Sequence, residues 1–240
     1  MFIFANMSLE KYLPLLSIEQ LSIYSESEVI LQIPHLVVRE QEFVAIIGPS
    51  GSGKTQLMQT LFGFKPLTKG LVWFLDIALH SLSLTQKSEL RQKIGLIQEE
   101  TYPLLKSHTL YEQLKLQLHA LGWQNELLIE NRLQQCADFM EIKYKNYALI
   151  GKLTRFEQIK AMLVRALINK PRFLLIDDIL MGLQKQDQIF ILEKLHDLVV
   201  HENISILLCT QQEQWLKHAP EALTYYYQNG EIITDKHLQS

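Results

Sequence analysis

The chain carries two kinds of hydrophobic run. Within the first 40 residues the runs are short or alternating, such as residues 21–24 and 29–33, and a polar turn at residues 25–28 separates them. Alternation with a period of two around a turn predicts an antiparallel β-layer. Three later runs, at residues 43–47, 173–176 and 204–208, are continuously apolar. Such runs are typical of parallel strands that are buried on both faces.

Amphipathic stretches lie between these runs. In residues 188–200 the apolar positions Ile189, Leu192, Leu195 and Val199 recur at helical spacing with charged residues between them. This spacing predicts a helix that packs one face on the sheet. The alternation of strands and helices places the chain in the α/β class, as a parallel sheet flanked by helices.

A long stretch in the middle of the chain has no buried-strand run. Its leucines form one helical stripe at Leu110, Leu114, Leu118 and Leu121 and a second one within residues 128–139. We therefore predict a helical lobe, about residues 99–165, inserted between two core strands.

The end of the chain predicts a hairpin. Its strands are residues 225–228 and 231–234, and Asn229-Gly230 between them accepts the positive φ of a tight turn. Since no repeat or low-complexity linker interrupts the chain, we predict a single domain over residues 1–240.

Composition narrows the possible partners. The chain has 240 residues, 48% of them apolar and 20% charged, which fits one globular unit with a full core. The net charge of −3 leaves no basic excess for nucleic acid or an anionic membrane surface, so we expect no nucleic-acid partner. No stretch has the ~18 uninterrupted apolar residues that span a bilayer, and any membrane role then depends on a partner.

Cys136 and Cys209 match no metal or disulfide pattern, so we interpret both as buried thiols without a role in the chemistry.

One motif carries specific chemistry. Residues 48–55 read Gly-Pro-Ser-Gly-Ser-Gly-Lys-Thr, a full G-x-x-x-x-G-K-[ST] match that follows a buried strand and precedes a helical run. In such a loop backbone N–H groups cradle phosphate, the lysine bridges the β- and γ-phosphates, and the threonine hydroxyl binds Mg²⁺. The predicted ATP contacts are Gly48, Ser50, Gly51, Ser52, Gly53, Lys54 and Thr55.

A carboxylate completes this predicted magnesium site. Asp177 ends the apolar run at residues 173–176, and the ends of parallel strands meet at one edge of a sheet. Asp177 can therefore hold Mg²⁺ through water. The alternative is a strand-end aspartate that only caps the next turn.

With these residues the sequence resembles the ATP-binding subunits of ABC transporters, which have a P-loop NTPase core, an antiparallel β-layer and an inserted helical lobe. Residues 94–98 are similar to the family's Q-loop, and residues 164–178 resemble the run into and through its Walker B strand. The resemblance implies that Gln98 joins Thr55 and Asp177 around Mg²⁺. It also implies that Tyr24 stacks on adenine, although core packing of Tyr24 is nearly as good an interpretation.

The family's signature loop is altered. Residues 153–157, Leu-Thr-Arg-Phe-Glu, stand where the family has L-S-G-G-Q, so both glycines are gone. In the family this loop approaches the γ-phosphate bound on the opposite subunit. Arg155 and Phe156 add bulk there, and Glu157 places an anion near an anion. Alternatively, Thr154 and Glu157 form a capping box that opens the following helix.

The hydrolytic residues have drifted as well. Asp178 occupies the place of the catalytic glutamate with a side chain one methylene shorter, and Gln211 replaces the switch histidine. Ile179 and Gln184 replace a proline and an aspartate of the family. The catalytic candidates are thus Asp178, as a weak water-orienting base, and Gln211. ATP binding is better supported than ATP turnover.

The resemblance implies an ATP-binding subunit that drives or gates transport through a membrane permease by ATP-dependent dimer closure, with weak or lost hydrolysis. Its partners would be the permease, docked near residues 98–105, and a second ATPase subunit in a homo- or heterodimer. The subunit would be located on the cytoplasmic side of a bacterial inner membrane. A non-hydrolysing scaffold paired with a catalytic ATPase is the alternative, and a P-loop kinase is a further one. The stretch 74–113 resembles lipid-transport (Mce-type), lipoprotein-release and cell-division systems, with a leaning to the first.

Overall fold

One ten-stranded sheet runs through the part of the chain that the structure, a computed structural model, describes: residues 14–75, 77–98, 103–142 and 148–234. Its strand order is β5-β4-β1-β2-β10-β9-β3-β8-β7-β6. The strands are β1 (Pro14–Ser25), β2 (Glu28–Arg39), β3 (Phe43–Ile47), β4 (Lys69–Phe74), β5 (Ile77–Ala78), β6 (Ile94–Ile97), β7 (Phe173–Asp177), β8 (Ser205–Thr210), β9 (Leu223–Gln228) and β10 (Glu231–Thr234).

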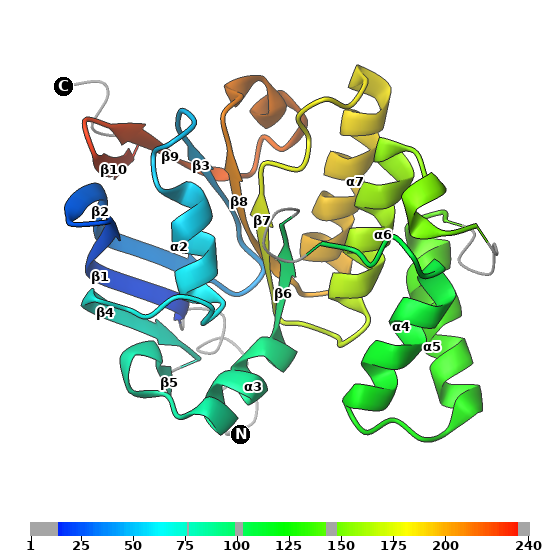
Figure 1. The fold of residues 1–240 in the computed structure, drawn as a ribbon. Helices are drawn as coiled ribbons and strands as arrows, with labels where there is room; N and C mark the ends of the chain where they lie inside the picture. Colours follow the sequence, from blue (N-terminus) through cyan, green and yellow to red (C-terminus); the bar gives the residue numbers. More distant parts are fainter. Residues whose placement is uncertain (1–13, 76, 99–102, 143–147, 235–240) are drawn as a thin grey trace, which may run out of the picture.

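Helices cover both faces of this sheet (Figure 1). The α-helices are α2 (Lys54–Leu61), α3 (Leu84–Lys93), α4 (Leu110–Ala120), α5 (Glu126–Phe139), α6 (Arg155–Leu167) and α7 (Lys185–His201). Short 3-10 turns are η1 (Leu79–Ser81), η2 (Ile150–Lys152) and η3 (Glu213–His218). The α/β class is therefore confirmed.

The predicted antiparallel layer is present but is not separate from the parallel strands. β1 pairs with β2 and β4, both antiparallel. The hairpin predicted near the C-terminus forms with Asn229 and Gly230 at φ 50° and 89°, and Gln228 pairs with Glu231 across the turn. Its strand β10 also pairs with β2 through Glu231 and Gln32, so a single sheet joins both halves.

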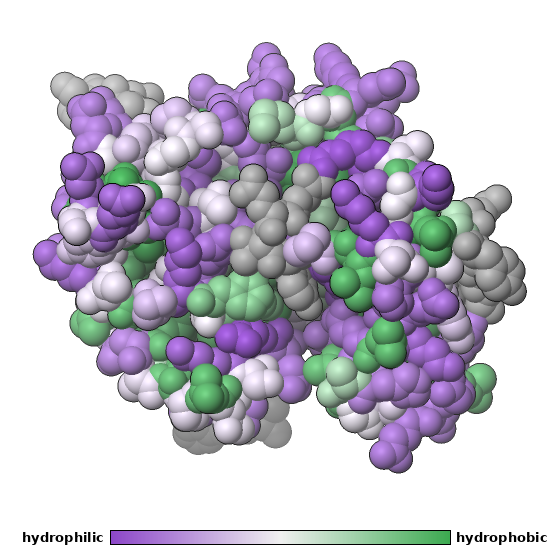
Figure 2. Space-filling view, viewed as in Figure 1, coloured by the Kyte–Doolittle hydropathy of each residue, from purple (hydrophilic) through white to green (hydrophobic). Residues whose placement is uncertain are grey.

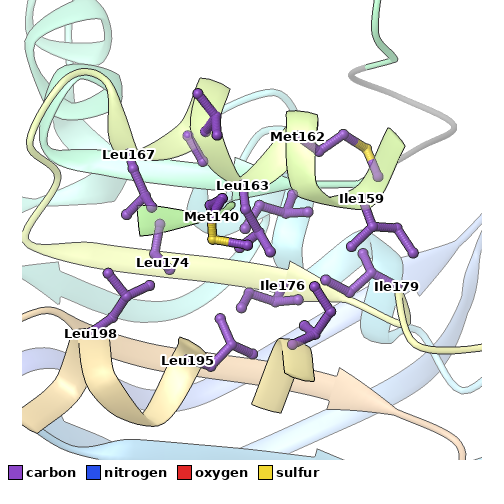
Figure 3. Packing of buried hydrophobic residues seen from close by; sticks show 14 of the residues in the cluster. Met140, Ile159, Met162, Leu163, Leu167, Leu174, Ile176, Ile179, Leu195 and Leu198 are labelled. Atoms are coloured by element: carbon purple, nitrogen blue, oxygen red, sulfur yellow. The ribbon is translucent and has the colours of Figure 1, made fainter. Parts of the chain in front are cut away.

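The parallel strands are buried on both faces, as their unbroken apolar runs predict. Along β7, Leu174 and Ile176 pack in one hydrophobic cluster, whereas Phe173 and Leu175 pack in another on the opposite face. Figure 3 shows Leu174 and Ile176 between the side chains of α6 and α7. α2 packs on the other face, because its Leu57 and Met58 share the cluster of Phe173.

Helices α4 and α5 form in the stretch where two leucine stripes predict them. Leu110, Leu114 and Leu118 are buried, while Leu121 is partly buried at the end of α4. Residues 99–102, at the start of the predicted lobe, and 143–147 lie outside the described residues. The extent of the lobe and the single-domain organisation remain predictions.

The buried face of α7 is turned relative to the predicted stripe. Ile191 and Leu198 are buried together with Leu192, Leu195 and Val199, whereas Ile189 is only partly buried. The helix packs a broader stripe on the sheet than the sequence spacing indicated.

The register of the parallel strands places the site. Ile47 of β3 lies opposite Thr210 of β8, and Asp177 of β7 lies opposite Cys209. All these strands therefore end at one edge of the sheet, where Gly48, Gln98 and Asp178 follow. Loops at the carboxyl edge of a parallel sheet are the usual ligand site of such folds.

The face of the molecule shown in Figure 2 is mostly polar. Figure 2 shows hydrophobic residues in small groups between hydrophilic ones on the face that it presents. Within residues 14–75, 77–98, 103–142 and 148–234, no helix is long and apolar enough to cross a membrane.

Candidate functional site

The loop between β3 and α2 has the backbone of a phosphate cradle. Gly53, which precedes α2, has φ 85°, in the left-handed region that favours glycine. A Cβ on Gly48 would lie 2.7 Å from the Cβ of Tyr227, so hairpin strand β9 closes tightly on the start of the loop. The Gly48 N–H donates to the carbonyl of Thr210 (3.1 Å). These contacts hold the loop at the sheet edge and leave its following amides beside the cleft.

The lysine of the loop lies inside this cradle. Lys54 is only 6% exposed, and its Nζ donates to the carbonyls of Gly48 (2.7 Å) and Pro49 (2.6 Å) and to Ser52 Oγ (2.9 Å). Burial lowers the pKa of Lys54, and the nearby Asp178 and Asp177 carboxylates oppose that shift. The Lys54 ammonium is therefore held in place by the loop itself.

Strands β6 and β7 bring two predicted ligands together. Gln98 directly follows β6, and its Nε2 donates to Asp177 Oδ2 at 2.8 Å. Gln59 of α2 donates its Nε2 to Gln98 Oε1 at 3.3 Å. Gln98 is 2% exposed, so these contacts fix its side chain. The sequence did not indicate Gln59, since nothing in the helix pattern says which polar residue of α2 faces the strand ends.

Asp178 is held by the end of β8. Its backbone has φ 45°, and its N–H donates to the carbonyl of Cys209 (2.9 Å). Thr210 Oγ1 donates to Asp178 Oδ1 (3.1 Å), and Gln211 Nε2 donates to Asp178 Oδ2 (2.8 Å). The two predicted catalytic residues are thus hydrogen-bonded to each other.

Thr210 is a site residue that sequence reasoning missed. It is 1% exposed, and its Oγ1 also accepts from the N–H of Gln212 (3.3 Å). A hydroxyl at the last position of a buried strand, next to Gln211, is the signal that could have identified it.

A cleft of about 680 Å³ opens at this edge of the sheet. It contains every predicted site residue except Gly48, whose carbonyl lies on Lys54, and Tyr24. Tyr24 is partly buried near the end of β1, and among the described residues Ser25 and Ile30 line that end of the cleft instead. The predicted residues that line the cleft are Ser50, Gly51, Ser52, Gly53, Lys54, Thr55, Gln98, Asp177, Asp178 and Gln211. The other lining residues are Ser25, Ile30, Gln56, Gln59, Lys65, Arg155, Ile179 and Met181.

The capping box predicted at the altered signature is confirmed. Thr154 Oγ1 accepts from the N–H of Glu157 (3.3 Å), and Glu157 Oε2 accepts from the N–H (2.8 Å) and hydroxyl (2.9 Å) of Thr154. Phe156 packs edge-on against Phe190 of α7, with ring centroids 5.4 Å apart. Glu157 and Phe156 therefore have structural partners within the chain. Arg155, between them and Thr154, lines the cleft.

The oxygen atoms of the site suit a hard cation better than a soft one. Within the described residues, no group of three or more His, Cys, Asp or Glu could hold a metal ion. Thr55, with its hydroxyl, and Asp177, with its carboxylate, line the cleft together; Gln98 lines it as well but turns its Nε2 toward Asp177 and its Oε1 toward Gln59. Such oxygen donors, completed by water and phosphate oxygens, are what Mg²⁺ prefers.

Comparison with known proteins agrees with this arrangement. The family model described as ABC transporter matches residues 31–180, which include the phosphate loop, Gln98, Asp177 and Asp178. The chain belongs to the ABC transporter family.

Sequence relatives of this ABC chain are distant. It is 26% identical over 202 residues to the cell division ATP-binding protein FtsE of Streptococcus pneumoniae, covering 83% of this chain and 85% of that one. It is 26% identical over 198 residues to the methionine import ATP-binding protein MetN 1 of Acinetobacter baylyi, covering 82% of this chain and 55% of that one. The chain thus spans about half the length of this second relative.

Solved structures show the same fold. The ATP-binding cassette MJ0796, in a dimeric post-hydrolysis state bound to ADP and phosphate, superposes with a TM-score of 0.79 at 22% identity, over 90% of this chain and 96% of that one. The cbiO1 protein of Clostridium perfringens, part of the ABC transporter complex cbiONQ, superposes with a TM-score of 0.81 at 19% identity, over 92% and 87%. The ABC cassette fold of the chain is therefore established.

Proposed function

We propose that this chain is the ATP-binding subunit of an ABC transport complex that closes on Mg-ATP and hydrolyses it weakly or not at all. The observation that carries the proposal is the contrast within one cleft. Lys54 lies within a complete phosphate loop, while both Asp178 carboxylate oxygens accept hydrogen bonds from the end of β8.

ATP fits the phosphate loop. Backbone amides before α2 and the buried Lys54 ammonium face the same cleft, and both favour an anion. Lys54 would bridge the β- and γ-phosphates, and Ser50, Gly51, Ser52 and Gly53 would supply N–H donors. A volume of about 680 Å³ is within the range of sites that bind a molecule of nucleotide size.

Mg²⁺ fits beside the phosphates. Thr55 and Asp177 would hold the ion, with Gln98 next to Asp177 through the 2.8 Å hydrogen bond. Bound there, Mg²⁺ would neutralise charge on the β- and γ-phosphates. Gln98 would then sense the ion through the same carboxylate.

Asp178 supports slow turnover rather than fast turnover. A water-orienting carboxylate must reach the water that attacks the γ-phosphate. Asp178 is short, and Thr210 and Gln211 direct its oxygens toward the end of β8. A misplacement of ~1 Å can cost about 100-fold in rate.

The same observation favours a second candidate function. The chain could serve as a non-hydrolysing scaffold that closes on ATP beside a more complete ATPase subunit. The scaffold function predicts that Asp178→Asn leaves assembly and transport unchanged, whereas slow hydrolysis by this chain predicts that the variant reduces transport. Membership of the ABC family, with its Q-loop order retained, disfavours a P-loop kinase.

A permease would dock beside the α-helices. A smaller groove of about 290 Å³ lies there, lined by Pro103, Leu104, Lys106, Ile150, Arg155, Gln158 and Met162. Arg165 donates to the carbonyl of Pro103 (2.9 Å), and Gln113 accepts from the N–H of Leu105 (2.9 Å). These bonds fix residues 103–105 of the predicted docking segment 98–105, of which residues 99–102 lie outside the described residues. Through such docking the subunit would lie on the cytoplasmic side of a bacterial inner membrane.

The sequence resemblance and the two relatives do not point to one transported substrate. The cell-division relative fits the wider group of systems that the sequence resembles, and the methionine relative belongs to an importer. Lipid transport of the Mce type stays a prediction.

Binding and assembly test the proposal together. Mg-ATP binding is measured by calorimetry and assembly by sedimentation for the wild type, Lys54→Ala and Asp178→Asn. We expect wild type and Asp178→Asn to bind Mg-ATP and to associate in its presence, alone or with the second ATPase subunit, and Lys54→Ala to do neither. A wild type that binds no Mg-ATP would contradict the proposal.

A further inference from the structure

Three side chains form a hydrogen-bonded chain at the end of the cleft where Asp177 lies. Gln59 Nε2 donates to Gln98 Oε1 (3.3 Å), and Gln98 Nε2 donates to Asp177 Oδ2 (2.8 Å). All three residues line the cleft, and both glutamine side chains are buried. The carboxylate proposed to hold Mg²⁺ is thus linked to a residue of α2 that has no part in the phosphate loop motif.

Strand geometry brings these side chains to one face of the sheet. Leu175 of β7 and Leu96 of β6 pack in the hydrophobic cluster that also contains residues of α2. Asp177 lies two positions after Leu175, and Gln98 lies two positions after Leu96. Because side chains alternate along a strand, both polar residues continue the α2 side. Gln59, in the last turn of α2, meets them there.

The carboxylate fixes the direction of the chain of hydrogen bonds. A carboxylate only accepts, whereas an amide side chain donates with its nitrogen and accepts with its oxygen. The contact with Asp177 therefore requires Nε2 of Gln98 and turns Oε1 toward Gln59, which must present its own Nε2. Reversing the Gln98 amide alone would place oxygen against carboxylate oxygen and nitrogen against nitrogen.

This direction is unfavourable for a cation beside Asp177. Mg²⁺ binds oxygen atoms and water. Gln98 instead presents N–H groups, the positive end of its amide dipole, to the carboxylate that would hold the ion. Its oxygen, which is the atom that suits a cation or a water bound to it, accepts from Gln59. Mg²⁺ at Asp177 therefore favours turning the Gln98 amide, and that turn breaks the hydrogen bond with Gln59.

We propose that Gln59 is a positioning residue that holds the Gln98 amide with its nitrogen toward Asp177 and so opposes Mg²⁺ binding. Removing the donor at position 59 would release Gln98 Oε1 to turn toward the ion, and Mg²⁺ would bind more tightly. This inference rests on the proposed binding of Mg-ATP and adds a residue that controls the metal affinity of that site.

The test separates metal binding from nucleotide binding. Binding of a non-hydrolysable ATP analogue to the full chain is measured by calorimetry in EDTA and again at saturating Mg²⁺. The ratio of the two affinities, called here the metal gain, reports how strongly the site favours Mg²⁺. A residue with only a structural role would change both affinities together and leave the metal gain unaltered.

Two variants remove the donor, so that the test does not depend on the folding of one. Gln59→Met keeps the length of the side chain, and Gln59→Leu is the second. The carbonyl of Gln59 accepts from the N–H groups of Phe64 (2.8 Å) and Lys65 (3.2 Å), so the end of α2 keeps these backbone contacts. The matched control is Gln92→Leu, at an exposed glutamine of α3 outside the cleft. Thermal melts check that each variant is folded.

Gln59→Met is expected to raise the metal gain about three- to tenfold, which is the weight of one neutral hydrogen bond. Affinity for the analogue in EDTA should change less than about twofold, and Gln92→Leu should resemble the wild type. In a Gln98→Ala background, adding Gln59→Met should change the metal gain less than about 1.5-fold, because the effect acts through Gln98.

Three results would overturn the inference. The first is an unchanged or smaller metal gain in the folded Gln59 variants. The second is an equal change of affinity in EDTA and in Mg²⁺, and the third is a full effect of Gln59→Met in the Gln98→Ala background. A wild type that binds the analogue in neither condition would overturn the proposed function as well. One that binds it equally well in both conditions would overturn the inference and leave ATP binding intact.

Discussion

The two ends of the nucleotide cleft are built differently. At the phosphate loop, a buried ammonium and backbone groups face the cleft, with Lys54 donating to Gly48, Pro49 and Ser52. At the ends of β7 and β8, a short carboxylate side chain, Asp178, accepts from the neutral side chains of Thr210 and Gln211.

The difference separates binding from turnover. Phosphate binding depends on backbone geometry and one cation, which the loop sequence preserves as a block. Hydrolysis depends on the placement of one carboxylate to within about 1 Å. A chain can therefore keep the first function while the second declines.

The largest effect is expected from a substitution in the phosphate loop. Lys54→Ala deletes the one loop cation and leaves the carbonyls of Gly48 and Pro49 without their buried donor. Mg-ATP affinity should fall at least about 100-fold, because a charged, desolvated contact to phosphate is lost. Calorimetry measures the change, with Lys152→Ala as the exposed control. A loss of less than about threefold would mean that the loop amides bind ATP without the lysine.

The second prediction concerns the length of the carboxylate side chain at position 178. Asp178→Glu extends the side chain by one methylene and is expected to raise steady-state phosphate release by about tenfold, since placement controls the rate. Mg-ATP affinity should stay within about twofold. If a folded Asp178→Glu protein shows no gain, Asp178 does not have the water-orienting role.

Thr210→Val tests the hydrogen bond that fixes Asp178. The variant keeps the shape of the buried side chain but removes its hydroxyl. The free energy of unfolding should therefore fall by about 1 to 2 kcal/mol. Denaturant melts measure this for Thr210→Val, Asp178→Ala and the double variant. The two changes should be non-additive by about 0.5 kcal/mol or more, and strict additivity would show that the 3.1 Å contact contributes nothing.

The smallest expected effect concerns the altered signature. Thr154→Ala removes the N-cap of α6 and should lower the free energy of unfolding by about 1 kcal/mol, whereas Thr154→Ser should be nearly neutral. Chemical denaturation of both variants checks the pair. Equal stability of Thr154→Ala and wild type would mean that the capping box does not stabilise the segment.

The sequence predicted the features that are encoded locally. A fixed spacing defines the phosphate loop, unbroken apolar runs mark β3 and β7, and Thr154 with Glu157 marks a helix start. In each case the residues that interact are neighbours in sequence.

Features that depend on contacts between distant segments could not be predicted in this way. The single pairing of Glu231 with Gln32 joins the two halves of the sheet across about 200 positions of chain. Gln59 meets Gln98, and Arg155 enters the cleft of its own chain, only after α2 and α6 have packed on opposite faces.

The most direct test of the account is phosphate release measured beside Mg-ATP binding on the same purified chain, with Lys54→Ala as the blank. We predict that the wild type binds Mg-ATP but releases phosphate little faster than Lys54→Ala. Release well above that blank, on the order of 1 per second or faster as in ordinary enzymes, would contradict the claim that this cleft binds ATP better than it consumes it.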